Sequence, residues 1–332
     1  MNKQFRLAAR PVGLPKASDW KLTEEPVPTP ADGEVLVQTE YISLDPAMRG
    51  WMNDAKSYVP PVELNAVMRA AAAGKVTASK HPGFAVGDAV EGVLGVQQYA
   101  ISNGRGLRKV DTKLAPLPAY LGGLGMSGLS AYFGLFEVGQ PKPGDTVLVS
   151  GAAGAVGSIA GQLAKAHGCR VVGIAGGAEK CAWLRELGFD GTIDYKSEKL
   201  SDGFRRELPK GLDVYFDNVG GDTLDAALTR INLHARVIIC GAISGYNATE
   251  KPKGPSNYLS LLINRARMQG FIVFDYIKKY NETYEVLNKH YAEGKLKLRE
   301  TIVEGFDTFP DSLLKLFKGE NTGKLILKVQ VQ

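Results

Sequence analysis

The sequence predicts an α/β protein with a β-rich first part and, in its second part, a parallel sheet covered by helices on both faces. Three observations support this. The first third holds many short, glycine-bounded, valine-rich segments without long helical periods, which favours a barrel or sandwich. After about residue 122, strand-like and helix-like segments alternate, which is typical of a parallel sheet. The length of 332 residues corresponds to about two domains.

The clearest strand of the first part is predicted over residues 34–42, directly after the turn signal of residues 30–33. Two shorter strands are expected in residues 74–76 and 87–93. Residues 51–69 lack regular periodicity and predict a loop with some helix.

The second part alternates short apolar strands with longer helical patterns. Strands are predicted at 146–150, 170–175, 192–195, 213–218 and 236–241, with helices at 156–167, 179–187 and 223–231. An amphipathic helix is expected over roughly residues 276–293, after an apolar segment that has the pattern of a buried strand, 271–273. The last strand, 324–329, is expected to rejoin the first domain and to make it discontinuous.

The composition narrows the class of ligand. Forty Lys and Arg residues against 35 Asp and Glu give a net charge of +5, spread along the chain, which favours a small anionic ligand over a nucleic acid. No apolar run approaches the roughly 18 residues of a membrane span. The three cysteines have no CxxC spacing and the N-terminus has no apolar leader, so we expect a cytoplasmic protein with the cysteines in its core.

The strongest motif is a strand that enters a glycine-rich turn and then a helix, residues 147–157. It carries the dinucleotide fingerprint with Ala152 in place of the first glycine, followed by Gly154 and Gly157. Gly154 would let a pyrophosphate approach the backbone, and Gly157 would let the helix pack closely. The unpaired amides at the start of the helix would point at the phosphates.

The strand that follows this turn ends without an acidic residue. NAD sites usually place an Asp or Glu there to bind the ribose diol. Residues 172–177 contain none, and Lys180 follows shortly. A lysine would attract a 2′-phosphate that a carboxylate would repel, so the sequence predicts NADP(H).

The sequence contains no spacing of residues that is typical of a metal site. A catalytic zinc needs about three His, Cys or carboxylate ligands. The four histidines are scattered, and the first 168 residues hold no cysteine. We therefore expect no metal, and hydroxyls, amides or the cofactor would stabilise an oxyanion. Candidate hydroxyls belong to Tyr58, Tyr246 and Tyr258, the last at the start of a helix that Ser256 or Asn257 could cap.

Over nearly its whole length the chain resembles the zinc-independent medium-chain reductases, in the branch of the leukotriene 12-hydroxydehydrogenases, prostaglandin reductases and alkenal/curcumin reductases. The segments that carry the resemblance are 45–49 (DPAMR), 128–135 (GLSAYFGL), 152–158 (AAGAVGS), 216–221 (FDNVGG) and 318–324 (KGENTGK).

The resemblance implies a GroES-like catalytic domain from residues 1–125 and 300–332, and a Rossmann NADP(H)-binding domain from 126–299. It also implies a homodimer, with NADPH in the cleft between the domains. The implied cofactor-binding residues are Met126, Ser130, Gly154, Ala155, Val156, Gly157, Gly176, Lys180, Tyr195, Asn218, Cys240, Gly241, Ala242, Ile243, Tyr246, Phe271, Ile272, Val273 and Asn321.

The implied activity is NADPH-dependent reduction of the C=C bond of α,β-unsaturated ketones or aldehydes, by hydride transfer to the β-carbon. Relatives of this branch carry a tyrosine where this chain has Ile263. The hydroxyl would come instead from Tyr258, from Tyr58 or from the cofactor ribose, and Tyr258 and Tyr58 are the candidate catalytic residues. Two alternatives remain open, an NADPH quinone reductase and an NADPH-binding sensor without activity.

Overall fold

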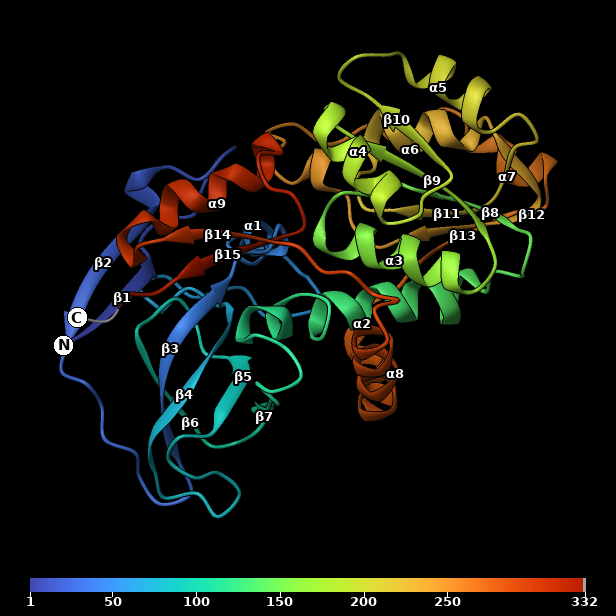
Figure 1. Cartoon of the computed structure of the whole chain (residues 1–332). Coiled ribbons are helices and arrows are strands. Elements are labelled where there is room, and N and C mark those ends of the chain that lie inside the picture. The colour runs from blue at the N-terminus through green and yellow to red at the C-terminus, as the bar shows by residue number, and fades with distance from the viewer. Residues whose placement is uncertain (331–332) are drawn as a thin grey trace. The chain divides into compact units, whose positions relative to one another are not determined.

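The computed structural model describes residues 1–330; residues 331 and 332, the end of the range expected for the first domain, lie outside the described part. The chain divides into two compact units. One contains Met1–Gly122 and Glu300–Gln332, and the other contains Gly123–Arg299. The first unit therefore combines the two ends of the chain, blue and red in Figure 1.

The first unit is built from β-sheets. Its strands are β1 (Asn2–Leu7), β2 (Trp20–Glu25), β3 (Val35–Ser43), β4 (Ala71–Ser79), β5 (Ala89–Val93), β6 (Tyr99–Ser102), β7 (Arg108–Lys109), β14 (Glu300–Glu304) and β15 (Lys324–Lys328). The seven-stranded sheet has the order β14-β15-β3-β4-β5-β7, with β6 also paired to β3, while β1 and β2 pair with each other. The last strand, β15, runs antiparallel to β3 with Ile326 opposite Ser43.

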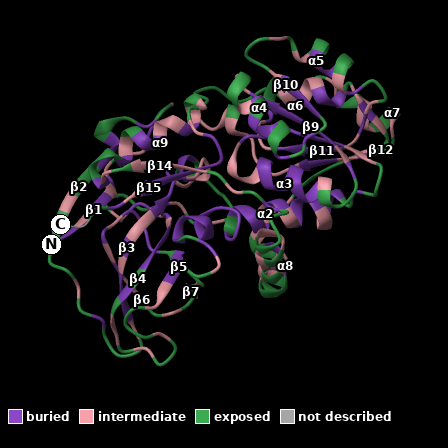
Figure 2. Cartoon of the chain, in the orientation of Figure 1, coloured by how far each residue is buried: buried purple, intermediate pink, exposed green. Residues whose placement is uncertain are grey.

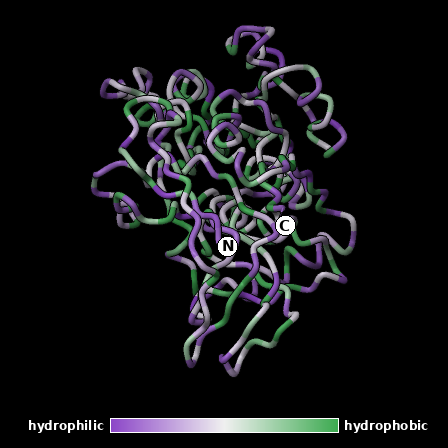
Figure 3. The backbone as a smooth tube through the Cα atoms, turned by 90° about the vertical axis from the view of Figure 1, so that its left-hand side faces the viewer, coloured by the Kyte–Doolittle hydropathy of each residue, from purple (hydrophilic) through white to green (hydrophobic). Residues whose placement is uncertain are grey.

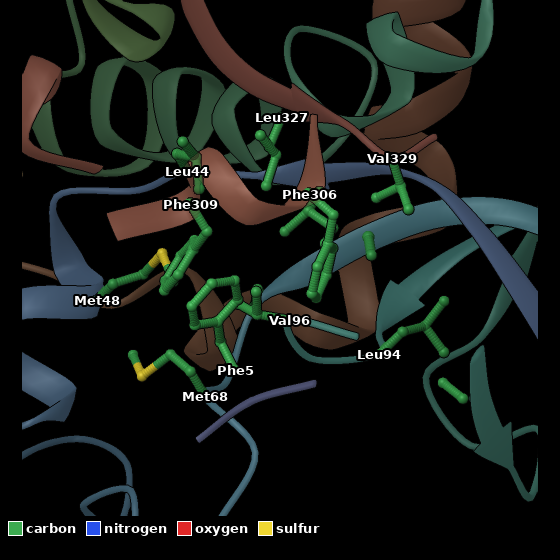
Figure 4. Close-up of a cluster of buried hydrophobic side chains, with 14 of the residues drawn as sticks. Phe5, Leu44, Met48, Met68, Leu94, Val96, Phe306, Phe309, Leu327 and Val329 are labelled. Atoms are coloured by element: carbon green, nitrogen blue, oxygen red, sulfur yellow. The ribbon is translucent and has the colours of Figure 1, made fainter. Parts of the chain in front are cut away.

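An aromatic core holds the first unit together (Figure 4). The ring of Phe5, from the first strand, lies 5.3 Å from that of Phe306 and 5.1 Å from that of Phe309. Phe309 begins helix α9 (Phe309–Lys318) and also contacts Trp20 edge-on at 5.0 Å. Short helix α1 (Ala47–Trp51) adds Met48 to the same cluster. Side chains from both ends of the chain thus share one core, which fixes the C-terminal segment to this unit.

The second unit is a doubly wound parallel sheet with the strand order β10-β9-β8-β11-β12-β13. Numbered along the unit this is 3-2-1-4-5-6, the Rossmann order, which confirms the predicted fold class. The strands are β8 (Thr146–Val149), β9 (Arg170–Ala175), β10 (Gly191–Asp194), β11 (Leu212–Asp217), β12 (Ile231–Ile239) and β13 (Arg267–Gly270). The helices are α2 (Met126–Phe133), α3 (Ala155–Ala166), α4 (Ala178–Glu186), α5 (Leu200–Glu207), α6 (Gly221–Leu228), α7 (Leu259–Ile263) and α8 (Tyr280–Ala292).

Two predicted boundaries near β12 are wrong. The helix predicted to reach residue 231 ends at Leu228, because Thr229 already caps it. Ile231 instead begins β12 and pairs with Leu212. His234 has φ of +61° and interrupts the alternation of side chains in β12. The first half of this strand therefore has no alternating sequence pattern from which it could be predicted.

The apolar segment at residues 271–273 is not the buried strand that its pattern favours. The strand lies earlier, at β13, whose four residues are all exposed. Phe271 follows it in irregular structure, and residues Val273–Lys279 form a 3-10 turn with a kink at Tyr276. Helix α8 consequently begins at Tyr280, four residues later than expected.

Burial separates the middle of the parallel sheet from its edge. Strands β8, β9 and β11 are almost entirely buried, and Figure 2 shows β9 and β11 in purple. Hydrophobic and hydrophilic residues alternate in short stretches along the chain (Figure 3). Among residues 1–330, no helix has the length and apolar character needed to cross a membrane.

Candidate dinucleotide site

The predicted phosphate turn lies where β8 ends and α3 begins. Gly154 is the N-cap of α3, with φ of −84° and ψ of 177°, and no side chain caps the helix. The amide of Gly154 donates to the carbonyl oxygen of Gly151 at 2.9 Å, which closes the turn. The first-turn amides of α3 have no partner within the helix, so they are free to bind an anion.

The two fingerprint glycines differ in their surroundings. A Cβ atom at Gly154 would meet only the carbonyl oxygen of Gly151, at 3.2 Å. A Cβ atom at Gly157 would overlap that same oxygen and lie 2.9 Å from Cα of Ala152. Gly154 therefore leaves the backbone open to a ligand, whereas Gly157 allows α3 to pack against the turn.

A second group of predicted residues meets at the ends of β9 and β10. A Cβ atom at Gly176 would lie 2.7 Å from the phenolic oxygen of Tyr195, so that ring covers the glycine. Burial lowers the pKa of Lys180, and the nearby charge of Lys196 lowers it further, whereas Glu179 raises it. Two neighbouring lysines whose charges repel each other are a suitable environment for a phosphate dianion.

Two acidic side chains near this cluster also bind other groups. Glu179, next to Lys180, accepts from Arg299 at 3.1 Å. Asp194, at the end of β10, accepts from the amides of Gly177 at 2.7 Å and Lys196 at 3.0 Å. Its carboxylate therefore orders the two turns that present Tyr195 and the lysines.

A third group lies after β11 and β12. The side-chain amide of Asn218 donates to the carbonyl oxygen of Ser150 at 2.7 Å. The phenolic oxygen of Tyr246 accepts from the amide of Ala242 at 3.1 Å. Burial, followed by the charge of Asp217, raises the pKa of Cys240 to about 12, which keeps the thiol neutral. Asn218 and Tyr246 thus shape the turn at residues 240–243, and Cys240 offers no thiolate.

The segment after β13 packs beside α2. A Cβ atom at Gly134 would lie 2.8 Å from Cζ of Phe271, so this ring lies against the π-helical turn that follows α2. The ring of Tyr276 stacks on that of Phe133 at 4.7 Å. Within α2, the hydroxyl of Ser130 donates to the carbonyl oxygen of Met126 at 2.9 Å. Ile272 and Val273, which complete this predicted group, are half-buried.

The candidate hydroxyls have different environments. Tyr258 is 58% exposed and is itself the N-cap of α7. The expected capping by Ser256 or Asn257 is wrong, because Asn257 binds Asp225 through both its backbone and its side-chain amide. Tyr58 is 48% exposed, and its oxygen accepts from Nε1 of Trp51 at 3.1 Å.

Two predicted residues, Tyr58 and Asn321, belong to the first unit, and the others belong to the second. The side-chain amide of Asn321 donates to the carbonyl oxygen of Gly323 at 2.9 Å and shapes the turn before β15. Sequence reasoning missed Ser150, Asp217 and Lys196. Two signals in the sequence could have indicated them. Asp217 directly precedes Asn218 in the DNV segment, and Lys196, the second lysine of the cluster, directly follows Tyr195.

The glycine turn and the Rossmann strand order are typical of dinucleotide-binding oxidoreductases. Residues 3–110 match the family model described as "N-terminal domain of oxidoreductase", and residues 155–289 match "Zinc-binding dehydrogenase". The chain belongs to the medium-chain dehydrogenase/reductase family, in its NADP-dependent reductase branch.

Its relatives match it from end to end. The Bacillus subtilis protein YfmJ is 48% identical over 98% of this chain and 97% of its own length. The NADPH-dependent curcumin reductase of Escherichia coli is 42% identical over 99% and 97%. Among solved structures, CurA of Vibrio vulnificus in complex with NADPH has a TM-score of 0.94 and 45% identity, and the match covers 99% of this chain and 100% of that one.

The residues do not fit the zinc in one of these family descriptions. Residues 1–330 contain no group of three or more His, Cys, Asp or Glu side chains that could hold a metal. One ring nitrogen of each histidine contacts a backbone group instead, in His81, His167, His234 and His290. We derive no step through a metal.

Proposed function

We propose that the chain is an NADPH-dependent reductase of the C=C bond in α,β-unsaturated ketones and aldehydes. The observation that supports it most is the pairing of an open phosphate turn at Gly154 with the lysines at the ends of β9 and β10. The first suits the pyrophosphate and the second suits the 2′-phosphate that distinguishes NADPH from NADH. The curcumin reductase of E. coli acts on an unsaturated ketone, which agrees with this substrate class.

Each part of the cofactor has its proposed residues. Residues Gly154, Ala155, Val156 and Gly157 would hold the pyrophosphate, and Gly176, Lys180 and Tyr195 the 2′-phosphate end. The nicotinamide end would be held by Met126, Ser130, Asn218, Cys240, Gly241, Ala242, Ile243, Tyr246, Phe271, Ile272, Val273 and Asn321. When bound, NADPH supplies the hydride that reaches the β-carbon of the substrate.

The chain's own contribution would be a proton donor and ordered turns around the cofactor. A hydroxyl would hold the carbonyl oxygen as negative charge develops on it, and a proton would then reach the α-carbon. Tyr258 and Tyr58 are the proposed groups. The bond from Trp51 orients the Tyr58 oxygen.

The domain roles follow from the same proposal. Residues 1–125 and 300–332 would form the GroES-like catalytic domain, and residues 126–299 the NADP(H)-binding domain. The three cysteines are free, with Cys169 and Cys181 buried, which suits a reducing, cytoplasmic location.

We also propose a homodimer formed through the β13 edge of the parallel sheet. Within residues 1–330, β13 pairs only with β12, and its four residues are exposed. Helix α7, just before it, exposes Leu262 by 73% and Ile263 by 68%. An open edge strand with an apolar neighbour suits a second copy, because a two-fold axis pairs the strand antiparallel with itself.

Leu262→Glu should produce monomers in light scattering, and Leu64→Glu, at an exposed leucine of the first unit, should not.

The test of the activity is a substrate panel. The purified protein should oxidise NADPH with 2-alkenals and enones and yield the saturated carbonyl product. An allylic alcohol would contradict the proposed regiochemistry, quinones as the only acceptors would identify a quinone reductase, and binding without turnover would identify a sensor.

Tyr258→Phe or Tyr58→Phe should lower kcat by about a hundredfold with unchanged NADPH affinity.

Cofactor choice is tested separately. Lys180→Ala and Lys196→Ala should each weaken NADPH binding by roughly tenfold and leave NADH binding unchanged. Lys289→Ala, at an exposed lysine on α8, is the matched control. A preference for NADH in the unmodified protein would contradict the assignment of the lysines.

A further inference from the structure

A buried carboxylate lies where the order of the parallel strands reverses. Asp217 ends β11, next to β8, and is 0% exposed. Ser150, directly after β8, is also fully buried. Ligands of doubly wound sheets bind outside the carboxyl ends of the strands at this point.

Every donor that reaches this carboxylate is neutral. Oδ1 of Asp217 accepts from the hydroxyls of Ser150 and Tyr215, both at 2.7 Å. It also accepts from the amides of Val219 and Gly220, both at 3.0 Å, and the Gly220 amide lies 3.2 Å from Oδ2. Among residues 1–330, no cation donates to Asp217.

The charge acts on its surroundings. Burial and then the Asp217 charge raise the pKa of Tyr215 well above its ordinary range, so the phenol remains a donor. The pKa of Cys240 rises for the same two reasons. The carbonyl oxygen of Asp217 accepts from the amides of Cys240 at 2.9 Å and Gly241 at 3.1 Å. The backbone carbonyl of Asp217 thus holds the turn at residues 240–243, and its carboxylate holds the turn at residues 218–220. Both turns contain residues that are proposed to line the nicotinamide.

We infer that Asp217 is an electrostatic positioning residue that favours the oxidised nicotinamide, whose ring is cationic, over the neutral reduced ring. This inference rests on the proposed function, since it requires the nicotinamide to approach these turns. A low-dielectric site makes such a charge effective over more than one residue diameter. Stabilising the product form of the cofactor would favour hydride donation.

A purely structural role makes a different prediction. Ser150 and Tyr215 bind the same oxygen as the turn amides, so their loss would loosen the same turns. Neither Ser150→Ala nor Tyr215→Phe removes the charge. These two variants are therefore matched controls for Asp217→Asn, which keeps the shape and removes the charge.

The experiment measures the dissociation constants of NADP+ and NADPH by calorimetry for all four proteins. Asp217→Asn should raise the ratio of the NADP+ constant to the NADPH constant by about fivefold or more. Ser150→Ala and Tyr215→Phe should keep the ratio within about twofold of the unmodified protein. An unchanged ratio in Asp217→Asn, or equal shifts in all three variants, would overturn the inference.

Two further outcomes are decisive. If Asp217→Asn does not fold, Asp217→Ser, which leaves room for water at the same donors, replaces it. If neither folds, the unmodified protein decides. NADP+ binding more than about tenfold weaker than NADPH binding would contradict a site biased toward the cation, and comparable or tighter binding of NADP+ would support it. Failure of the unmodified protein to bind either nucleotide would instead refute the proposed function.

Discussion

In the second unit, Gly161 and Gly173 lie in crowded surroundings at the interface of sheet and helices, whereas Gly154 and Gly177 lie in open surroundings at the carboxyl edge of the sheet. A Cβ atom at Gly161, in α3, would overlap the ring of Phe189, and one at Gly173 would lie 2.7 Å from Leu184. At Gly177 nothing lies within 4 Å, and at Gly154 only one backbone oxygen does. Packing explains the first two glycines, and a positive φ of +101° explains Gly177. Neither explanation applies to Gly154, whose open side is where we propose the cofactor.

The comparison predicts its largest effect at a crowded glycine. In Gly161→Ala, helix propensity favours the variant by about 1 kcal/mol, but displacing the Phe189 ring costs about 3 kcal/mol. We expect a net loss of about 2 kcal/mol in the free energy of unfolding, measured by urea denaturation. Adding Phe189→Leu should restore part of it, because a smaller side chain makes room. Equal losses with and without that second change would show that the ring is not the obstacle.

An open glycine should behave in the opposite way. Gly154→Ala keeps an ordinary backbone conformation, so stability should change by less than about 1 kcal/mol. The added methyl group would lie on the proposed path of the pyrophosphate, so NADPH affinity should fall about tenfold, or 1.4 kcal/mol. Gly50→Ala, at an open glycine within α1 of the first unit, should leave NADPH affinity unchanged and raise stability by up to about 1 kcal/mol through helix propensity. Unchanged NADPH affinity in Gly154→Ala would remove this turn from the site.

The fold was predictable where the signal is local. The strands β8 and β9 are short apolar runs, and the turn between β8 and α3 depends on residues within one fingerprint, so both were predicted. The exposed edge strand β13 carries no apolar alternation, and its apolar neighbour Phe271 is used in packing against Gly134. The apolar pattern therefore predicted a strand at residues 271–273 and not at β13. Helix α5 was not predicted either, since only Gly203 and Phe204 of it are buried.

The site was predictable to the same extent. The phosphate turn follows from glycine positions, but the bond between Ser150 and Asp217 joins residues 67 positions apart. Such a pair becomes visible only when β8 and β11 are known to be neighbours. Asp194 is a similar case, because the carboxylate that orders the end of β9 comes from β10.

The smallest predicted effect concerns Lys180, whose buried charge lowers the stability of the folded protein when no ligand is bound. Since burial and Lys196 lower the pKa of Lys180 below its unfolded value of about 10.4, the charged form destabilises the folded state at any pH below the folded pKa. This cost disappears as the pH rises toward the unfolded value. Lys180→Gln should therefore melt about a degree higher than the unmodified protein at pH 7, and the difference should shrink toward pH 10.

Saturating NADPH should reverse that order, because a phosphate dianion turns the buried charge from a cost into a contact. Melting curves with and without nucleotide, at neutral and alkaline pH, measure both halves. A variant that melts lower without ligand would mean that Lys180 already has a stabilising role in the empty fold. Packing within the fold would then explain the shape of this sheet edge, as it explains the crowded glycines, and a ligand would not be needed.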